Sequence, residues 1–484
     1  MDSVVDMNPA QQILMPSPNI TSPTPDTLHI LSGSFRSLSL FLLAFSPTKR
    51  TLSFVQQVPG FGPHQYVGSN REKIKRLRKN SKDQTEGLKA YTTSWALPPI
   101  LSSWEITPEW DVNHIDNVLI TAVSSYITLP PPYTHVYSMG GPTGEAHLLS
   151  SLTGSFVEKI QELTFVPLEK LAEADKTRKA LRYGSHGIEF AHSSSTDVRL
   201  AFVPVLGTNS IEVYTHNPDT GFLTHVYSSP SPRVGVEDGP RHVKIHPNGK
   251  VLYCVTEHNN LLDVYSIAGN DDTLVEGTSK WPTNPLTHLG TRSLVPPHLS
   301  YPSAPLETVH RFRGDTLMLG PSAGEGNLPT EIWATTRGAT EDERGWVSVF
   351  ELDQDGMLVS SLSDEGVERY ETPTSGGKAH AIDLFPKSTA SFESTNASHQ
   401  GSPVWILLTD DSDHAAGEVR EPQDEASSSK PIGGVRVLEW NGWFNGGVRE
   451  VVGWPSEGKN EGLDGELMRG GSHAVWLTIE DSLD

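Results

Sequence analysis

The sequence has a single cysteine, Cys254, among its 484 residues. One cysteine excludes an intrachain disulfide and any zinc site built from several cysteines. Such a chain suits a reducing compartment, and we therefore expect a cytoplasmic protein. Cys254 lies in Val-Leu-Tyr-Cys-Val, a pattern typical of a buried strand, so we expect an inert thiol in the core.

Basic residues and long hydrophobic runs are also scarce. Lys and Arg total 37 against 59 Asp and Glu, which gives a formal net charge of -22. A protein this acidic is a poor general partner for nucleic acid or for anionic lipid. The most apolar run, residues 38–45, is far shorter than the roughly 20 residues of a membrane helix. We expect no nucleic-acid or membrane partner, and the sequence leaves a homo-oligomer open.

Several familiar chemical motifs are missing. The chain has no phosphate-binding loop, nicotinamide fingerprint or His-Glu-x-x-His helix. Its 19 histidines show no close spacing typical of metal ligands. The sequence therefore predicts no metal site and no bound cofactor.

Turn-forming residues are abundant, with 42 Gly and 36 Pro, and they separate short apolar strands. One pattern recurs: a strand often ending in Val-Tyr or Val-Phe, a polar turn and a second strand. The clear copies begin at residues 41, 211, 262, 347 and 435, with weaker copies at 95–106 and 135–149. The 51 residues between the copies at 211 and 262 match the roughly 50-residue unit of propeller blades.

Seven such units predict an all-β protein, a seven-bladed β-propeller of four-stranded antiparallel blades. Radial closure leaves only short protected sheet edges, and residues 472–477 could form the closing strand. Two β-sandwiches or a β-helix are alternatives that explain the repeat length less well.

The remaining segments have other patterns. We expect a flexible N-terminal segment at 1–27, followed by a single propeller domain over 28–484. Loop insertions are expected near three polar stretches, at residues 70–87, 387–402 and 418–430. A helical or loop insertion is expected around 156–181, beginning with an amphipathic helix at Phe156 that Pro167 ends.

Five ionisable residues stand at strand edges of the repeat region: His186, Arg241, Glu257, Arg337 and His380. Residues at the ends of the innermost strands of a propeller can converge at one mouth of its central channel, where ligand sites are common. Each residue also has a structural interpretation. The histidines could be ordinary hydrogen-bonding groups, the first arginine could pair with the glutamate, and the second arginine could lie on the surface.

The stretch GPRHVKIHPNGKVLYCVTEHNNLLDVYSI, at residues 239–267, resembles the signature blade of the lactonase-type seven-bladed propellers. That superfamily includes 6-phosphogluconolactonases and the fungal carboxy-cis,cis-muconate cyclases. SHGIEF, ATTRGATEDERGWVSVFEL and SGGKAHAIDLFP resemble the fungal cyclase branch in particular. The resemblance is clearest over residues 184–440, and the chain departs from the family pattern between about 60 and 180.

The resemblance implies an active site made of a His, two Arg and a Glu, which fall on His186, Arg241, Glu257 and Arg337. It implies an intramolecular lyase that interconverts 3-carboxy-cis,cis-muconate and its carboxymuconolactone in the β-ketoadipate pathway of aromatic catabolism, without a metal or redox cofactor. The arginines, with His380, would bind the small tricarboxylate substrate. His186 or Glu257 would donate a proton, and a glutamate beside arginine is normally ionised, which favours the histidine.

Two other functions remain open. A 6-phosphogluconolactonase-like hydrolase would need a phosphate site, and a basic residue beyond Arg241 and Arg337 near the channel would favour it. A non-catalytic propeller scaffold is the other alternative, because this fold serves many unrelated functions.

Overall fold

The computed structural model describes residues 27–80, 86–177, 179, 182–192, 199–268, 284–322, 328–359, 364–387, 401–411, 433–455, 468 and 470–479. Three sequence-based predictions fall wholly or mostly outside these residues. They are the flexible segment at 1–27, apart from Thr27, the loop at 418–430, and the loop at 387–402 apart from its ends.

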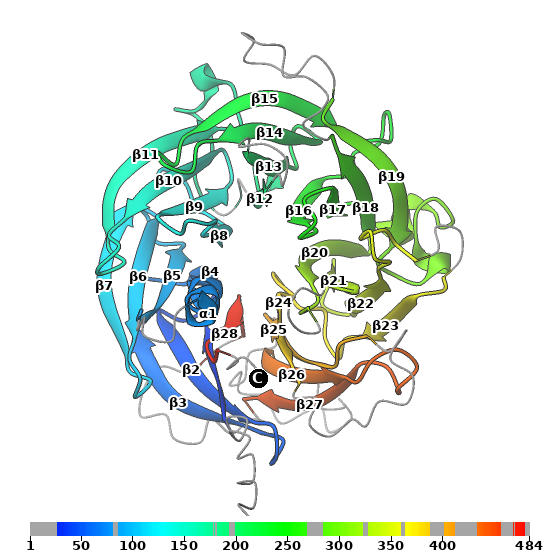
Figure 1. Cartoon of the computed structure of the whole chain (residues 1–484). Helices are drawn as coiled ribbons and strands as arrows, with labels where there is room; N and C mark the ends of the chain where they lie inside the picture. Colours follow the sequence, from blue (N-terminus) through cyan, green and yellow to red (C-terminus); the bar gives the residue numbers. More distant parts are fainter. Residues whose placement is uncertain are drawn as a thin grey trace, which may run out of the picture.

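Seven four-stranded antiparallel sheets stand in a ring around one axis, as Figure 1 shows, and confirm the predicted propeller. From the axis outward, the first blade contains β28 (Ala474–Trp476), β1 (Leu28–Ser32), β2 (Ser39–Ser46) and β3 (Thr51–Pro59). The second contains β4 (His64–Ser69), β5 (Leu88–Ser94), β6 (Ile100–Ile106) and β7 (Val112–Leu119). The third contains β8 (Tyr126–Thr128), β9 (His135–Gly140), β10 (Thr143–Leu149) and β11 (Phe156–Thr164).

The other four blades follow in chain order. The fourth contains β12 (Glu189–His192), β13 (Arg199–Val205), β14 (Ser210–His216) and β15 (Leu223–Pro230). The fifth contains β16 (Pro240–Ile245), β17 (Val251–Thr256), β18 (Leu261–Ile267) and β19 (Leu286–Ser293). The sixth contains β20 (Phe312–Leu319), β21 (Glu331–Gly338), β22 (Trp346–Glu351) and β23 (Val367–Glu371). The seventh contains β24 (Ile382–Pro386), β25 (Val404–Asp410), β26 (Gly434–Trp440) and β27 (Arg449–Trp454).

The two ends of the described chain meet in the first blade. β28 pairs antiparallel with β1, and Trp476 lies opposite Ile30. The Trp476 indole is fully buried among side chains of the first and seventh blades. The predicted closing strand at 472–477 is therefore present, and hydrogen bonds and apolar packing close the ring.

The five clear copies of the recurring sequence pattern correspond to the third strand of a blade and the outer strand that follows it, whereas the weaker copy at 135–149 covers the second and third strands of the third blade. These third strands are buried on both faces, because each packs against the blades on either side. Cys254, on the second strand of the fifth blade, is packed in the same way: it is 1% exposed, between side chains of the fourth and fifth blades. Burial raises the pKa of its thiol well above the usual range, as expected of an inert core thiol.

The predicted helix at Phe156 is wrong. Residues 156–164 form β11, which pairs with β10 at the outer edge of the third blade. An outer strand faces solvent over much of its length. Charged residues therefore interrupt the two-residue alternation of apolar and polar side chains, and the remaining apolar residues fall at a spacing that resembles a helix. The connection that follows β11 contains the short helix η1 (Leu168–Lys170).

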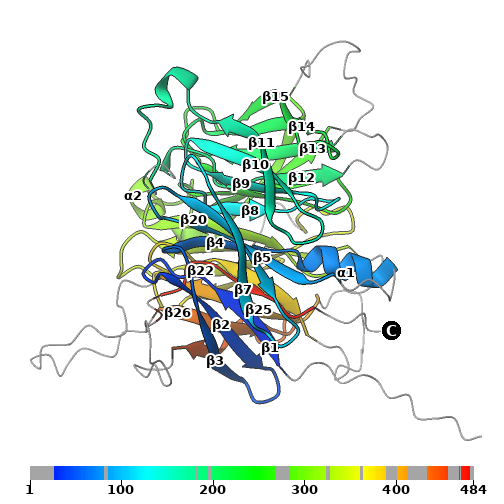
Figure 2. The same ribbon diagram turned by 90° about the vertical axis from the view of Figure 1, so that its left-hand side faces the viewer.

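The predicted loop at 70–87 is wrong for residues 71–80, which form helix α1 (Arg71–Asn80) between β4 and β5. Lys, Arg and Leu favour a helix, and Ile74 anchors it in the core at 2% exposure. Two short helices, η3 (Pro297–Leu299) and α2 (Leu306–Val309), lie between β19 and β20. Figure 2 places α1 and α2 on opposite faces of the ring. No helix in the described part of the chain is long and apolar enough to cross a membrane.

Candidate active site

Four of the five predicted site residues come from three consecutive blades, and His380 precedes β24 of the next blade. His186 precedes β12, Arg241 is the second residue of β16, Glu257 directly follows β17, and Arg337 lies near the end of β21. The first three are buried, with 3%, 7% and 7% of their surface exposed. Arg241 Nη1 donates to Glu257 Oε2 at 2.5 Å, and Arg337 Nη2 donates to Glu257 Oε1 at 3.2 Å. Glu257 therefore joins the two arginines.

Asp315 on β20 completes this group, and the sequence analysis missed it. Its Oδ1 accepts from Arg241 Nη2 at 2.5 Å, and its Oδ2 lies 3.8 Å from Arg337 Nε. Its backbone carbonyl also accepts from Arg241 Nε at 3.2 Å. Arg241, Arg337, Glu257 and Asp315 form what we call the arginine–carboxylate cluster. The recurring pattern marked third and outer strands, so an acidic residue on an inner strand gave no signal.

The electrostatics of the cluster keep both carboxylates ionised. Burial alone would raise the pKa of Glu257, but the guanidinium groups of Arg241 and Arg337 outweigh it and hold that pKa well below its usual range. The same balance lowers the pKa of Asp315, with a further contribution from the backbone N–H of His380. Glu257 therefore carries no proton to donate near neutral pH.

One glycine allows the fifth and sixth blades to meet at this cluster. A Cβ on Gly314 would lie 2.1 Å from the carbonyl oxygen of Thr256, a distance no side chain can tolerate. The Gly314 N–H instead donates to the Glu257 carbonyl at 3.1 Å. The inner strand β20 can therefore lie directly against the end of β17, which brings Asp315 to Glu257.

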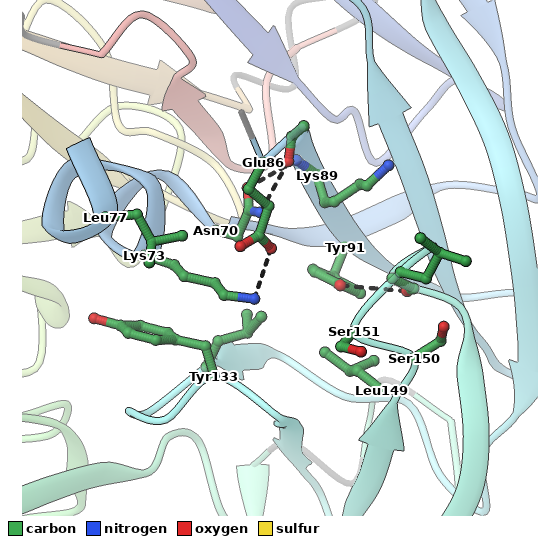
Figure 3. Close-up of a pocket in the computed structure, with 14 residues that line it drawn as sticks. Asn70, Lys73, Leu77, Glu86, Lys89, Tyr91, Tyr133, Leu149, Ser150 and Ser151 are labelled. Carbon is green, nitrogen blue, oxygen red and sulfur yellow. Dashed lines mark hydrogen bonds and ion pairs between the residues drawn. The ribbon is translucent and has the colours of Figure 1, made fainter. Parts of the chain in front are cut away.

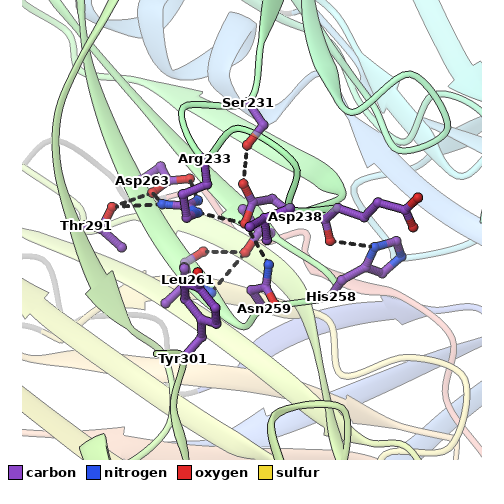
Figure 4. Close-up of polar contacts among 12 residues, drawn as sticks. Ser231, Arg233, Asp238, His258, Asn259, Leu261, Asp263, Thr291 and Tyr301 are labelled. Carbon is purple, nitrogen blue, oxygen red and sulfur yellow. Dashed lines mark hydrogen bonds and ion pairs between the residues drawn. The ribbon is translucent and has the colours of Figure 1, made fainter. Parts of the chain in front are cut away.

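A second polar network fixes the connection that leads into Arg241. Figure 4 shows Arg233 between Asp238 and Asp263: its Nε donates to Asp238 at 2.7 Å, and its Nη1 donates to Asp263 at 3.0 Å. Asp238 also accepts from Asn259 at 2.7 Å, and its backbone carbonyl accepts from the N–H of His258 at 3.0 Å. The network holds the chain on both sides of the site, immediately before Arg241 and immediately after Glu257.

Four histidines surround the cluster. His186 Nδ1 contacts Ser125 Oγ at 3.2 Å. A positive charge on the His186 ring would lower the pKa of the Glu257 carboxyl. His380 meets the cluster through its backbone, whose N–H donates to Asp315 at 2.7 Å, while its Nδ1 faces the Thr336 carbonyl at 3.0 Å. His242 and His473 were not predicted from the sequence. Burial lowers the pKa of both, to about 3 for His473, so their rings are neutral at physiological pH.

Several buried polar atoms around the cluster lack a hydrogen-bond partner among the described residues. They are His242 Nδ1, Arg337 Nε, His380 Nε2 and His473 Nδ1. Nearly all buried polar atoms in proteins are hydrogen-bonded to protein or ordered water. Unpartnered atoms contributed by the fifth, sixth, seventh and first blades therefore mark this end of the ring as a place for a polar ligand.

A further group of charged side chains lies on the inner strands of the third, fourth and fifth blades. Lys244 Nζ donates to the Tyr126 hydroxyl at 2.8 Å, and both groups contact the Glu189 carboxylate. Burial raises the pKa of Tyr126 well above its usual range, and the charge of Glu189 adds to this effect. This group satisfies its own charges, and Tyr126 packs edge-on against His242.

A cavity of about 330 Å³ lies elsewhere, beside α1 (Figure 3). Tyr91 and Tyr133 line it, and Lys73 makes an ion pair with Glu86 at 2.6 Å. It contains none of the predicted site residues. It adjoins α1, whereas β20 begins beside α2, so the cavity and the cluster lie on opposite faces of the ring.

Comparisons with known proteins agree with the predicted resemblance. The family model described as "Lactonase, 7-bladed beta-propeller" matches residues 170–292, which include His186, Arg241 and Glu257 but not Arg337. Muconate cycloisomerase 1 of Cutaneotrichosporon cutaneum is 26% identical over 369 residues, which cover 75% of this chain and 84% of that protein. A 6-phosphogluconolactonase of Erwinia tasmaniensis is 26% identical over 226 residues, covering 46% of this chain and 61% of that protein.

Two solved structures share the fold. The periplasmic gluconolactonase of Pseudomonas aeruginosa superimposes with a TM-score of 0.52 at 15% identity, covering 85% of this chain and 99% of that chain. A protein from Lactobacillus plantarum superimposes with a TM-score of 0.56 at 13% identity, covering 93% of this chain and 100% of that chain. The resemblance to the lactonase-type propellers, with a fungal muconate cycloisomerase among the relatives, is thereby confirmed.

Proposed function

We propose that this chain, a propeller similar to the lactonase family, is an intramolecular lyase that interconverts 3-carboxy-cis,cis-muconate and its carboxymuconolactone. The observation that carries the proposal is the arginine–carboxylate cluster beside His186, in a chain 26% identical to a muconate cycloisomerase over 369 residues. The reaction would belong to aromatic catabolism in the cytoplasm, and a small tricarboxylate would be the partner.

The chemistry requires one bond to form and one proton to move. A carboxylate oxygen of the substrate attacks a carbon of its own conjugated diene and closes a five-membered lactone. The π electrons of that double bond pass to the neighbouring carbon and onto the carboxylate conjugated with it, and a proton then reaches the carbon. Atoms and electrons balance without an oxidant, a reductant or water.

Arg241 and Arg337 suit the binding part of this reaction. A guanidinium group stays charged and binds two carboxylate oxygens in one plane. Positive groups already held in place also stabilise the enolate-like charge that develops as the ring closes. Because Glu257 and Asp315 fix both arginines, little reorganisation is needed when substrate enters.

His186 is the proposed proton donor. Glu257 is ionised between two arginines, so it serves better as the group that orients them. General acid catalysis by a positioned side chain contributes a factor of about 10²–10⁴. Bending one arm of the substrate toward its own alkene would add a contribution from proximity.

An ultraviolet assay tests the proposal. Purified protein is mixed with 3-carboxy-cis,cis-muconate, with and without a chelator, and loss of the conjugated-diene absorbance is followed while the product is identified. We expect chelator-insensitive loss of absorbance with a lactone product in wild type, and a loss about 10²–10⁴-fold slower with His186→Ala. An unchanged spectrum with wild type would refute the proposed reaction.

A second function, hydrolysis of a sugar phosphate lactone, is favoured by one specific observation. Arg313 is a basic residue beyond Arg241 and Arg337 at the same site, and its charge acts on Glu257. The similarity to the Erwinia 6-phosphogluconolactonase adds support. Proton release from 6-phosphogluconolactone, measured above its spontaneous hydrolysis, would establish this activity.

A further inference from the structure

We propose that Arg313 binds the third carboxylate of the substrate and thereby determines specificity for tricarboxylates. This inference rests on the proposed function, which supplies a substrate with three carboxylates. Arg313 is not one of the four residues of the predicted active site, so the inference gives it a new role.

The first argument is the charge of the arginine–carboxylate cluster. Arg241 lies against Glu257 and Asp315, and Arg337 lies against the same two carboxylates. Both carboxylates are ionised, because their pKa values are lowered. Two positive and two negative groups cancel, so the cluster alone offers little net attraction to a trianion.

The second argument is the position of Arg313. It lies on β20 two residues before Asp315, and in the antiparallel register it stands opposite Arg337. Side chains directly opposite each other in an antiparallel pair point to the same face of the sheet, so Arg313 and Arg337 share one face. The charge of Arg313 also acts on Glu257, in agreement with this place beside Arg337.

The third argument is that Arg313 has no direct ion-pair partner in the described part of the chain, since Glu257 acts on it only at a distance. Its guanidinium group makes no hydrogen bond or ion pair with any residue in the described part of the chain. The side chain is partly buried, and burial lowers its pKa, while Arg337 and Arg182 add repulsion. An arginine remains charged in such a place, and a desolvated charge without a partner is unfavourable.

A bound oxyanion would pair with this partly buried charge. A carboxylate can accept two parallel hydrogen bonds from one guanidinium, and such charge-assisted bonds are among the strongest in proteins. A phosphate group has the same planar pair of acceptors, so the shared chemistry is that of an oxyanion. Under the proposed function, the group that binds Arg313 is a carboxylate, and the experiment must distinguish a carboxylate from a phosphate.

The test uses a matched pair of unreactive probes, propane-1,2,3-tricarboxylate and glutarate, which differ by one carboxylate. Their binding is measured by isothermal titration calorimetry with wild type, R313M, R313K and R311M. In wild type we expect the tricarboxylate to bind about 10-fold to 100-fold more tightly than glutarate, as one charge-assisted contact predicts. R313M should bind the two probes equally, and R313K should retain part of the preference.

R311M is the control for net charge, since Arg311 lies two residues away and is paired with Glu343 on the surface. It should keep the wild-type preference. The inference is overturned if wild type shows no preference or binds neither probe, if R313M keeps the preference, or if R311M loses it equally.

A second pair of probes, 6-phosphogluconate and gluconate, identifies the oxyanion. If R313M abolishes only the preference for the phosphorylated probe, the carboxylate assignment is overturned in favour of phosphate. Because these are binding measurements, they are independent of turnover. An Arg313-dependent preference in a protein that leaves the muconate unchanged would refute the proposed reaction and keep the carboxylate site.

Discussion

Glu257→Gln removes the negative charge between Arg241 and Arg337 while it preserves the size of the side chain. In wild type the two carboxylate oxygens accept from the two arginines at 2.5 and 3.2 Å. Glutamine is neutral, so both ion pairs are lost: its amide oxygen keeps one hydrogen bond, and its NH2 group faces the donors of the other guanidinium. Removing one partner of a buried ion pair destabilises a protein by about 3–5 kcal/mol, and the retained amide oxygen puts the expected loss near the lower value.

The assay compares thermal or urea unfolding of Glu257→Gln with that of Glu343→Gln. Glu343 pairs with Arg311, whose side chain is 52% exposed, and exposed pairs contribute at most about 1 kcal/mol. The double variant Glu257→Gln, Arg337→Met should lose less stability than the two single losses added, because Arg337 no longer faces an amide donor. Equal losses in the two glutamine variants, or additive losses in the double variant, would refute this account of the cluster.

The sign of the pH dependence also follows. The folded-state pKa of Glu257 lies below the ordinary value of 4.5. Its ionised form therefore contributes stability above about pH 4.5, and that contribution is lost as pH falls toward the folded-state value. The deficit of Glu257→Gln should be full at pH 7 and should shrink below about pH 4.5.

Three further predictions concern other residues. His186→Ala should lower kcat for the muconate by about 10²–10⁴-fold with an unchanged melting temperature, and undiminished kcat would remove His186 as proton donor. Burial raises the pKa of Glu331 from 4.5 to about 7, so its neutral form contributes stability that is lost as pH rises through about 7. Glu331→Gln should then exceed wild type in stability by up to about 3 kcal/mol at pH 8, with little difference at pH 4.5, and parallel pH curves would contradict this. Trp476→Ala should reduce the free energy of unfolding by about 3–5 kcal/mol because it opens a cavity at the ring closure, and a loss below about 1 kcal/mol would show that β28 does not seal the ring.

Much of the fold could be predicted because third strands buried on both faces have a strong apolar signature. Val213 and Val264, for example, occupy equivalent places in adjacent blades, and the pattern around each is easily aligned. The outer strand beginning at Phe156 could not be assigned this way, since solvent removes the constraint on its exposed positions. Helix α1 was missed because its charged residues resemble a solvated loop, and among its described side chains, residues 71–78, Ile74 is the one that is buried.

The site was predicted only in part, for a related reason. Family resemblance located four residues, but no sequence pattern shows that Glu257 is shared between two arginines or that Asp315 duplicates that role. Those contacts arise because Gly314 allows two blades to approach closely. The lack of a direct ion pair at Arg313 is likewise a property of the assembled ring, because it depends on how β20 and β21 lie beside the cluster.

The most direct test of the central claim is a comparison of two substrates with one preparation of the protein. The value of kcat/KM is measured for 3-carboxy-cis,cis-muconate from its ultraviolet absorbance and for 6-phosphogluconolactone from proton release. The account predicts rapid conversion of the muconate to a lactone, lost in Arg337→Ala, with the phosphorylated lactone a poor substrate. Rapid hydrolysis of the phosphorylated lactone beside an unchanged muconate spectrum would contradict it.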